Sequence, residues 1–453
     1  MEDTWVYILS ATSLLFLLYL FKLQRSSKRN LPPAPPSLPI IGHLHLIKEP
    51  VHRTLQSLSD RYGPVLSLSL GSRPAVVISS VRGRGVLHQE RHRPRQPPRT
   101  LAGEIMAYGN TNIGTAPYGP HWRNLRRLTA VEILSPHRLT GSLAIRQEEV
   151  RHLMRSLYEA ASSSQGGGFA RVEMSSRLQE MSFNIIMRMI SGKRYSGAAV
   201  DAGDAEVARE YRELIKEEFE LSGTDPGDFL PVLRKVVDFK GRERRMVDAA
   251  NRSDVILQGM IDEHRSRRKR SDADGSREEE SKTMIETMLS EGYSDDIIKG
   301  QINSIIGAGT DTSAVTIEWA MSLLLNHLDV MKKAQVELDD IVGRDRLVDE
   351  ADTHKLPCLH NIINEALRLF PPAPLLVPHE SAEDCTIGGF DVPRGTMIPV
   401  NAWAIRRDPK VWDDPTNFKP ERYDGLEGDH AYRLLPFGMG RRSCPVLALP
   451  IEW

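Results

Sequence analysis

The residues best suited to chemistry lie near the end of the chain, in the segment Phe437-Gly-Met-Gly-Arg-Arg-Ser-Cys444. A cysteine thiolate binds metal and stays ionised only where N–H donors and a positive centre stand near it. The glycines let the loop fold tightly and bring backbone N–H groups close to the sulfur. An ordinary glycine-rich turn around a buried cysteine is the simpler alternative.

A second candidate is the patch Ala308-Gly-Thr-Asp-Thr-Ser313, which interrupts a strongly apolar helical stretch. Gly, Thr and Ser weaken the hydrogen-bond ladder of a helix, so the patch predicts a kink or a bulge. A carboxylate, Asp311, beside a hydroxyl, Thr312, can deliver protons through water without flooding a buried site. The alternative is that the hydroxyl groups bond only the helix's own carbonyl groups.

Two residue pairs have spacings that place both side chains on one face of a helix. Glu365 and Arg368 are three positions apart, and Trp122 and Arg126 are four positions apart. A lone Glu-x-x-Arg pair is usually a surface salt bridge of small effect. The pairs therefore gain meaning only from the segments that accompany them.

These segments, in this order, resemble the cytochrome P450 family, and the resemblance extends from the N-terminal apolar run to Pro445. It implies haem b as the cofactor, held by the thiolate of Cys444, with Phe437 shielding the sulfur. Gly440 and Arg442 complete the loop's pattern, and Arg442 pairs with a haem propionate. The same resemblance implies roles for further residues: Trp122, Arg126 and His379 at the propionates, Arg422 as a third member beside Glu365 and Arg368, and Asp311 with Thr312 as the pair that guides protons.

The resemblance also implies a reaction. An enzyme of this family inserts one atom of O2 into a small apolar or aromatic substrate, with electrons from NADPH through NADPH–cytochrome P450 reductase. Thiolate ligation favours O–O cleavage. A basic patch of Arg123, Arg126 and Arg127 is expected to form part of the reductase footprint. On family position alone, the substrate pocket includes Met106, Tyr108, Ala308, Gly309, Leu375 and Leu376, with Ala308 and Gly309 leaving room beside the iron.

The proline-rich segment after the N-terminal apolar run, together with residues 371–381, is similar to plant microsomal members of the family. The nearest group is the isoflavone 2'-hydroxylase-like branch, which includes hydroxylases of isoflavonoids, indolic compounds and lignans. The resemblance therefore implies a substrate of the plant specialised-metabolite type. It does not specify the substrate or the carbon that is attacked.

The rest of the pattern predicts the elements that position these residues. The longest apolar helical run, about 295–328, is too apolar for a surface helix and is expected to cross the domain. A second helix, about 358–370, stops at two prolines. Alternating stretches predict a hairpin over 65–78 and strands at 385–387 and 397–400. Solvated connectors are expected at 162–168 and 262–282, and a localisation signal is the alternative for the second. The predicted fold class is mainly α with a small β-rich part, as in the P450 fold.

The N-terminus carries a membrane signal. Residues 5–21 are almost wholly apolar, and at about 1.5 Å per residue they would form a helix of roughly 25 Å. Acidic residues precede this run and basic residues follow it, which predicts a cytosolic body on the endoplasmic reticulum. We expect a single-pass anchor in membrane lipid over 1–24, a basic, proline-rich hinge over 25–40 and a haem-thiolate catalytic domain over 41–453. A cleaved secretory signal is the alternative, and the acidic start opposes it.

Composition excludes other classes. The chain has 59 basic and 60 acidic residues and a formal net charge of -1, which gives no case for binding nucleic acid. Its three cysteines, Cys358, Cys385 and Cys444, are odd in number and far apart. Neither a disulfide framework nor a zinc site is expected from them.

Two segments depart from the family pattern. The family has a glycine where this chain has Val446, and a β-branched residue is disfavoured wherever φ must be positive. Family members also continue for roughly another helix and a strand pair, so the chain is expected to be truncated at its C-terminus. Residues 82–99 are rich in arginine and lack helical periodicity where the family has an amphipathic helix. We hypothesise that 82–99 and 446–453 are out of frame, which resequencing the transcript would decide.

Two further functional hypotheses stand beside the monooxygenase. The departures motivate an inactive, haem-poor product of a damaged gene or a faulty gene prediction. A haem-thiolate enzyme that rearranges peroxides without NADPH is the other, and the pair Asp311 and Thr312 argues against it.

Overall fold

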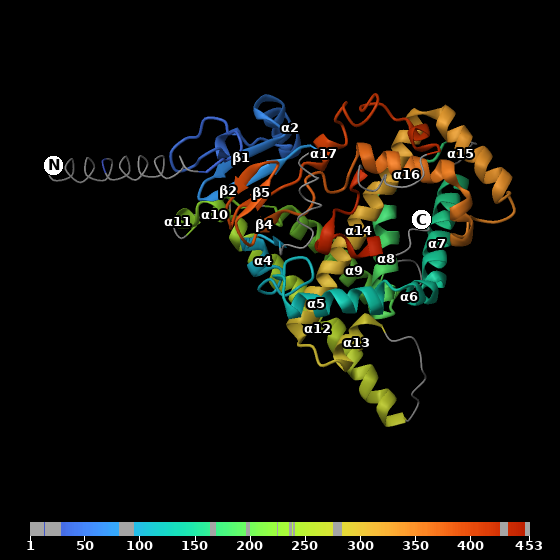
Figure 1. Ribbon diagram of the computed structural model, residues 1–453. Coiled ribbons are helices and arrows are strands. Elements are labelled where there is room, and N and C mark those ends of the chain that lie inside the picture. Colours follow the sequence, from blue (N-terminus) through green and yellow to red (C-terminus); the bar gives the residue numbers. More distant parts are fainter. Residues whose placement is uncertain are drawn as a thin grey trace.

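A computed structural model describes residue 13 and residues 29–80, 95–163, 169–195, 200–223, 225–234, 238, 241–274, 283–425 and 434–448. The fold is mainly helical with a small β-rich part, as predicted from the sequence. Figure 1 shows the strands and α2 on one side of the molecule and most of the long helices on the other. The helices are α2 (Val51–Tyr62), α4 (Leu101–Ile105), α5 (Pro120–Leu128), α6 (Pro136–Gly141), α7 (Leu143–Ser162), α8 (Met174–Ser191), α9 (Ala202–Leu221), α10 (Pro226–Phe229), α11 (Pro231–Arg234), α12 (Arg242–Asp274), α13 (Met284–Ser290), α14 (Asp295–Asn326), α15 (Leu328–Ile341), α16 (Pro357–Leu369) and α17 (Ala402–Ile405).

The larger sheet has five strands in the order β1-β2-β7-β4-β3, and a second sheet pairs β5 with β6. The predicted hairpin is confirmed, because β1 and β2 are antiparallel and join at the Leu70–Arg73 pair. β7 runs parallel to β2 and antiparallel to β4, so the C-terminal third of the chain completes a sheet begun near the N-terminus. The strands are β1 (Val65–Leu70), β2 (Arg73–Ile78), β3 (Arg95–Gln96), β4 (His379–Ser381), β5 (Cys385–Ile387), β6 (Phe390–Val392) and β7 (Met397–Ile398).

The predicted long helix is α14, which starts after Ser294 with two aspartates in its first turn, where the helix dipole favours negative charge. Its isoleucines Ile298, Ile302 and Ile306 are fully buried in the largest apolar core, which α8, α9, α12 and α13 also build. The second predicted helix is α16, which begins with a proline in its first turn and ends just before Pro371. The patch 308–313 is α-helical throughout, so the predicted bulge was wrong, and the kink stays a prediction.

Close packing of α14 against α8 depends on a glycine. A Cβ added at Gly309 would lie 3.0 Å from Cδ1 and 3.2 Å from Cγ1 of Ile186 on α8. The expectation that Gly309 leaves room beside an iron is therefore corrected, because its bare side faces a neighbouring helix. Two positions earlier, a Cβ at Gly307 would meet Phe219 at 3.6 Å, an ordinary contact.

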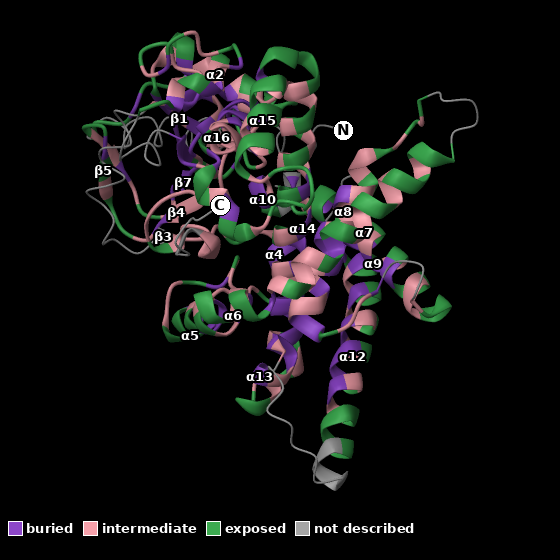
Figure 2. Cartoon of the chain, turned by 90° about the vertical axis from the view of Figure 1, so that its right-hand side faces the viewer, coloured by how far each residue is buried: buried purple, intermediate pink, exposed green. Residues whose placement is uncertain are grey.

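The predicted connector at 262–282 was partly wrong, because α12 continues to Asp274. Arg267 pairs with Glu263 one turn before it, and Arg265 reaches Asp295 on α14. Such pairs stabilise a helix whose charged side chains face water. Figure 2 shows α12 protruding from the body, with exposed residues toward its outer end. The connector expected after α7 is consistent with the end of that helix at Ser162.

Several predictions fall largely outside the described residues. No helix among the described residues is long and apolar enough to cross a membrane. The predicted anchor over 1–24, apart from residue 13, lies outside the described part of the chain. Of the arginine-rich segment, residues 95–99 are described: β3 pairs with β4, and the side chain of Gln96 accepts a hydrogen bond from the Tyr118 N–H.

The packing of α14 on α8 can be tested with two alanine substitutions. Alanine is about 1 kcal/mol more favourable than glycine inside a helix, so Gly307→Ala should be neutral or stabilising. Gly309→Ala should unfold at lower denaturant, with a cost of about 1–3 kcal/mol relative to Gly307→Ala, because the core must shift. When Ile186→Ala is added to each of the two variants, their stabilities should become equal. Equal stability of the two single variants would contradict the packing role.

Candidate active site

The cysteine loop is tightly turned. The N–H of Cys444 donates to the carbonyl oxygen of Phe437 at 2.9 Å, which closes the loop across its glycines. Gly438 has a φ of 71° and Gly440 a φ of 79°, values that side chains rarely tolerate. A Cβ at either glycine would meet nothing within 4 Å, so the requirement is backbone conformation and not space.

Opposing influences act on the sulfur of Cys444. Burial raises the pKa of the thiol, while a hydrogen bond from the backbone N–H of Val446 and the charge of Arg126 lower it. Val446 lies in a 3-10 turn, Pro445–Ala448, and is absent from the residues with positive φ. The concern that valine is strained at this position is therefore corrected, because the turn is right-handed. Its N–H is one of the donors that a thiolate needs.

Helix α5 holds the loop from one side. Nη1 of Arg126 donates to the carbonyl oxygen of Ser443 at 2.7 Å, and Nη2 of Arg442 donates to that of Ala116 at 2.6 Å. The Arg442 guanidinium lies 4.7 Å from the ring centre of Trp122. The structure thus brings Arg442 of the loop to Trp122 and Arg126, the pair that the sequence singled out on one helix face. Arg126 turns inward, so only Arg123 and Arg127 of the predicted basic patch remain exposed.

The chemistry of this donor set fits a haem group. Arg126 is half-buried and meets no carboxylate among the described residues, and burial lowers the pKa of its guanidinium. A cation in that setting is stabilised by an anion such as a propionate. The neighbouring thiol supplies the soft ligand that iron takes in haem-thiolate proteins. Trp122 is buried and donates from Nε1 to the Ile113 carbonyl oxygen at 3.0 Å. This bond holds α5 against the segment that precedes it.

The middle of α14 has an open face. Ala308 and Thr312 are exposed although Ile306, Gly307 and Thr310 beside them are buried. The hydroxyl of Thr312 donates to the carbonyl oxygen of Ala308 at 2.7 Å. An exposed line of residues along the middle of a core helix leaves space for a large planar group.

Asp311 is half-buried on α14. Burial raises the pKa of its carboxyl above the ordinary value, and the charge of Lys216 on α9 opposes the shift. The next residue, Thr312, is exposed. A half-buried carboxyl and an exposed hydroxyl are therefore adjacent on this helix.

A buried ionic cluster joins the segments that support the cysteine loop. Glu365 and Arg368 on α16 have fully buried side chains and form two hydrogen bonds, of 2.7 and 2.8 Å. Nε of Arg422 reaches Oε1 of Glu365 at 3.0 Å, and the N–H of Lys419 donates to the same oxygen. The cluster therefore joins α16 to the segment 418–423, as the resemblance implied, and is not a surface pair.

Sequence reasoning missed two buried residues that join segments around the site. Arg406 is 1% exposed, donates to the carbonyl oxygens of Leu367 and Leu435 at 2.6 and 2.7 Å, and links α16 to the start of the cysteine loop. Burial lowers its pKa to about 9. Gln301, fully buried on α14, donates to Thr129 and accepts from the N–H of Ile113. A glutamine among the isoleucines of α14 was a usable signal, whereas nothing in the sequence marked Arg406.

The predicted pocket residues do not share one environment. Met106 is buried in the main core. The hydroxyl of Tyr108 donates to Asp254 at 3.0 Å, and Lys299 donates to the same carboxylate oxygen at 2.7 Å. Leu375 and Leu376 pack against two different clusters under the sheet, and His379 is half-buried at the start of β4. Of the α14 residues in this set, Ala308 alone lies on the open face.

Comparison with known proteins agrees with this geometry. The family model described as Cytochrome P450 matches residues 32–445. The chain belongs to the cytochrome P450 family. This P450 is 48% identical to an isoflavone 3'-hydroxylase of Medicago truncatula, over 98% of the chain and 87% of the relative. It is 45% identical to an isoflavone 2'-hydroxylase of Glycyrrhiza echinata, over 97% and 86%. A zebra fish cytochrome P450 solved with progesterone matches with a TM-score of 0.70 and 28% identity, over 88% of each chain.

The buried cluster gives a direct test. Glu365→Gln removes the charge that balances Arg368 and Arg422, so we expect this P450 to lose about 3–5 kcal/mol of stability in urea unfolding followed by circular dichroism. Asp339→Asn removes the carboxylate from the exposed Arg344–Asp339 pair and should change stability little. A similar small effect of both substitutions would refute the bracing role of Glu365.

Proposed function

We propose that this P450 is a haem-thiolate monooxygenase that hydroxylates a small apolar or aromatic molecule of the plant specialised-metabolite type. Its electrons come from NADPH through NADPH–cytochrome P450 reductase. The observation that carries the proposal is the cysteine loop, with the sulfur of Cys444 beside the Val446 N–H and the Arg126 charge. The substrate class is supported by the relatives named for hydroxylation of isoflavones.

Bound haem would supply an iron centre at which O2 is reduced and one oxygen atom is passed to a C–H bond. Cys444 would bind the iron through its thiolate, and the Arg126 and Arg442 guanidiniums would pair with the propionates, with His379 as a further partner. Trp122, whose Nε1 is bound to the Ile113 carbonyl oxygen, would hold the Arg442 guanidinium in place through its ring. Phe437 closes the loop through its carbonyl oxygen.

The open face of α14 would manage protons and substrate. The raised pKa of Asp311 lets its carboxyl hold a proton to higher pH than an exposed aspartate. Thr312 stands next to it with its hydroxyl on the exposed side of the helix. Ala308 presents only a methyl group there, which suits an apolar substrate.

The N-terminal segment extends the proposal to the membrane. A single-pass anchor over 1–24 and the proline-rich hinge would hold the catalytic domain on the cytosolic face of the endoplasmic reticulum, where a membrane-bound reductase could reach it. Deleting residues 1–24 should shift the protein from the microsomal to the soluble fraction, and unchanged sedimentation would refute the anchor.

The damaged-gene alternative has no support from the comparisons or the geometry. Val446 fits a right-handed turn and contributes an N–H to the sulfur, so this one of the departures that motivated the alternative is compatible with ligation. The peroxide-rearranging alternative does not require NADPH. Turnover that continues without NADPH would therefore favour it over the monooxygenase.

The role of Cys444 can be tested by spectroscopy. The purified P450, reduced and exposed to carbon monoxide, should show the long-wavelength absorption band typical of thiolate-ligated haem. Cys444→Ser should abolish that band and NADPH-dependent hydroxylation of isoflavones, because a neutral hydroxyl cannot replace the thiolate. Cys358→Ser, on α16, should keep both. A full band in Cys444→Ser would overturn the proposed ligation.

The role of Thr312 can be tested by the coupling of NADPH consumption to product formation. Thr312→Ala should retain the carbon monoxide spectrum but lower the ratio of product formed to NADPH consumed by about tenfold or more, in line with the usual contribution of a positioned proton-transfer group. Thr312→Ser should keep most of the coupling. Thr316→Ala, one turn away, removes a similar bond to the helix and serves as the control. Equal coupling in Thr312→Ala and Thr316→Ala would contradict the role.

A further inference from the structure

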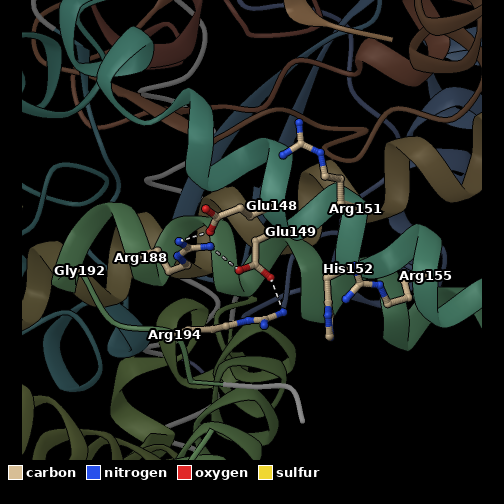
Figure 3. Close-up of a pocket in the computed structure, with 8 residues that line it drawn as sticks. All are labelled: Glu148, Glu149, Arg151, His152, Arg155, Arg188, Gly192 and Arg194. Carbon is tan, nitrogen blue, oxygen red and sulfur yellow. Dashed lines mark hydrogen bonds and ion pairs between the residues drawn. The ribbon is translucent and has the colours of Figure 1, made fainter. Parts of the chain in front are cut away.

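A charged groove lies between α7 and the C-terminal end of α8 (Figure 3), and no residue of the cysteine loop is among those that line it. Its volume is about 470 Å³, and it is open to solvent. Most of its lining side chains are basic. They are Arg151, His152, Arg155, Arg188 and Arg194, set against Glu148 and Glu149.

The floor of the groove is a fixed, neutral ionic cluster. Glu149 is 2% exposed and accepts from Nη1 of Arg188 at 2.8 Å and from Nη2 of Arg194 at 2.9 Å. Glu148 takes the other Arg188 nitrogen at 2.6 Å. Two carboxylates thus balance two guanidiniums, and the buried carboxylate of Glu149 bonds both guanidiniums.

The rim of the groove carries positive charge in excess of this balance. Arg151 and Arg155 are one turn apart on α7, an arrangement of like charges that destabilises a helix. Within the described part of the chain, neither makes an ion pair, and Arg151 only meets Gln147 at 3.4 Å. Glu159, one turn beyond Arg155, lies outside the groove lining and forms no ion pair with it among the described residues.

The groups point into a common space. Figure 3 shows the Arg194 guanidinium, the His152 ring and the Arg155 guanidinium in one row beside α7, whereas Arg151 points to the other side. Nε of Arg194 is buried and has no hydrogen-bond partner among the described residues. A planar guanidinium and an imidazole are donors that match the oxygens of a phosphate.

We propose that this groove binds a phosphate group, with Arg155 and His152 as the contacts that the protein does not otherwise use. The floor cluster holds Arg194 and Arg188 in position, and the rim supplies the unbalanced charge. A free phosphate compound and the headgroup of a phospholipid share this chemistry. The site is separate from the cysteine loop, so ligand binding there does not require haem.

The test is calorimetric titration of the full-length chain at constant ionic strength, with two probes: inorganic phosphate and a short-chain, water-soluble phosphatidic acid. Saturable binding of either probe is expected, and the tighter one identifies the source. Arg155→Gln should weaken that binding about tenfold, the usual effect of losing one charged hydrogen bond. His152→Gln should weaken it as well, and the His152 ring protons should shift on addition of the probe in NMR spectra.

Arg268→Gln is the matched control. It removes the same charge from an exposed position on α12 that does not line the groove, and should leave the affinity unchanged. The proposal is overturned if neither probe binds, if Arg155→Gln binds as tightly as the parent chain, or if Arg268→Gln weakens binding as much as Arg155→Gln.

Discussion

The catalytic end of this P450 depends on a buried carboxylate that two guanidiniums neutralise. An unpaired charge at the position of Glu365 would cost several kcal/mol, so Arg368 and Arg422 must stay in place. Their remaining N–H groups then bind main-chain oxygens: Arg368 donates to the carbonyl oxygens of Arg406 and Pro415. Because Arg406 in turn holds Leu435, the cluster fixes the start of the cysteine loop.

The loop is supported from two directions by cations that bond carbonyl groups. Arg406 holds it from the side of α16, and Arg126 holds it from α5. Neither arginine is paired with a carboxylate within the described residues, and burial lowers the pKa of both. Of the two, Arg126 acts on the sulfur of Cys444: its charge favours the thiolate and lowers the pKa of the thiol, although burial is the larger effect and keeps that pKa above its ordinary value.

Short motifs and long periodic segments were predictable from the sequence, because local chemistry determines them. The hairpin at β1 and β2, the helices α14 and α16, and the grouping of Trp122 with Arg126 follow from spacing and turn residues. Three features depended on tertiary contacts and were missed. Gly309 faces Ile186 across helices, Arg406 bridges segments distant in sequence, and Arg265 of α12 pairs with Asp295 on α14. None of these partners is visible in a local pattern.

The hydrogen bond from the Thr312 hydroxyl to the Ala308 carbonyl oxygen determines whether Thr312 can donate or accept on its open side. A threonine hydroxyl has one hydrogen, and here it is committed to the helix's own carbonyl oxygen. On its open side the oxygen can then only accept. A proton crossing this part of the site must originate elsewhere, and Thr312 serves as a fixed receiver that orients the donor. Serine preserves that polarity, whereas valine, of nearly the same shape, would erase it.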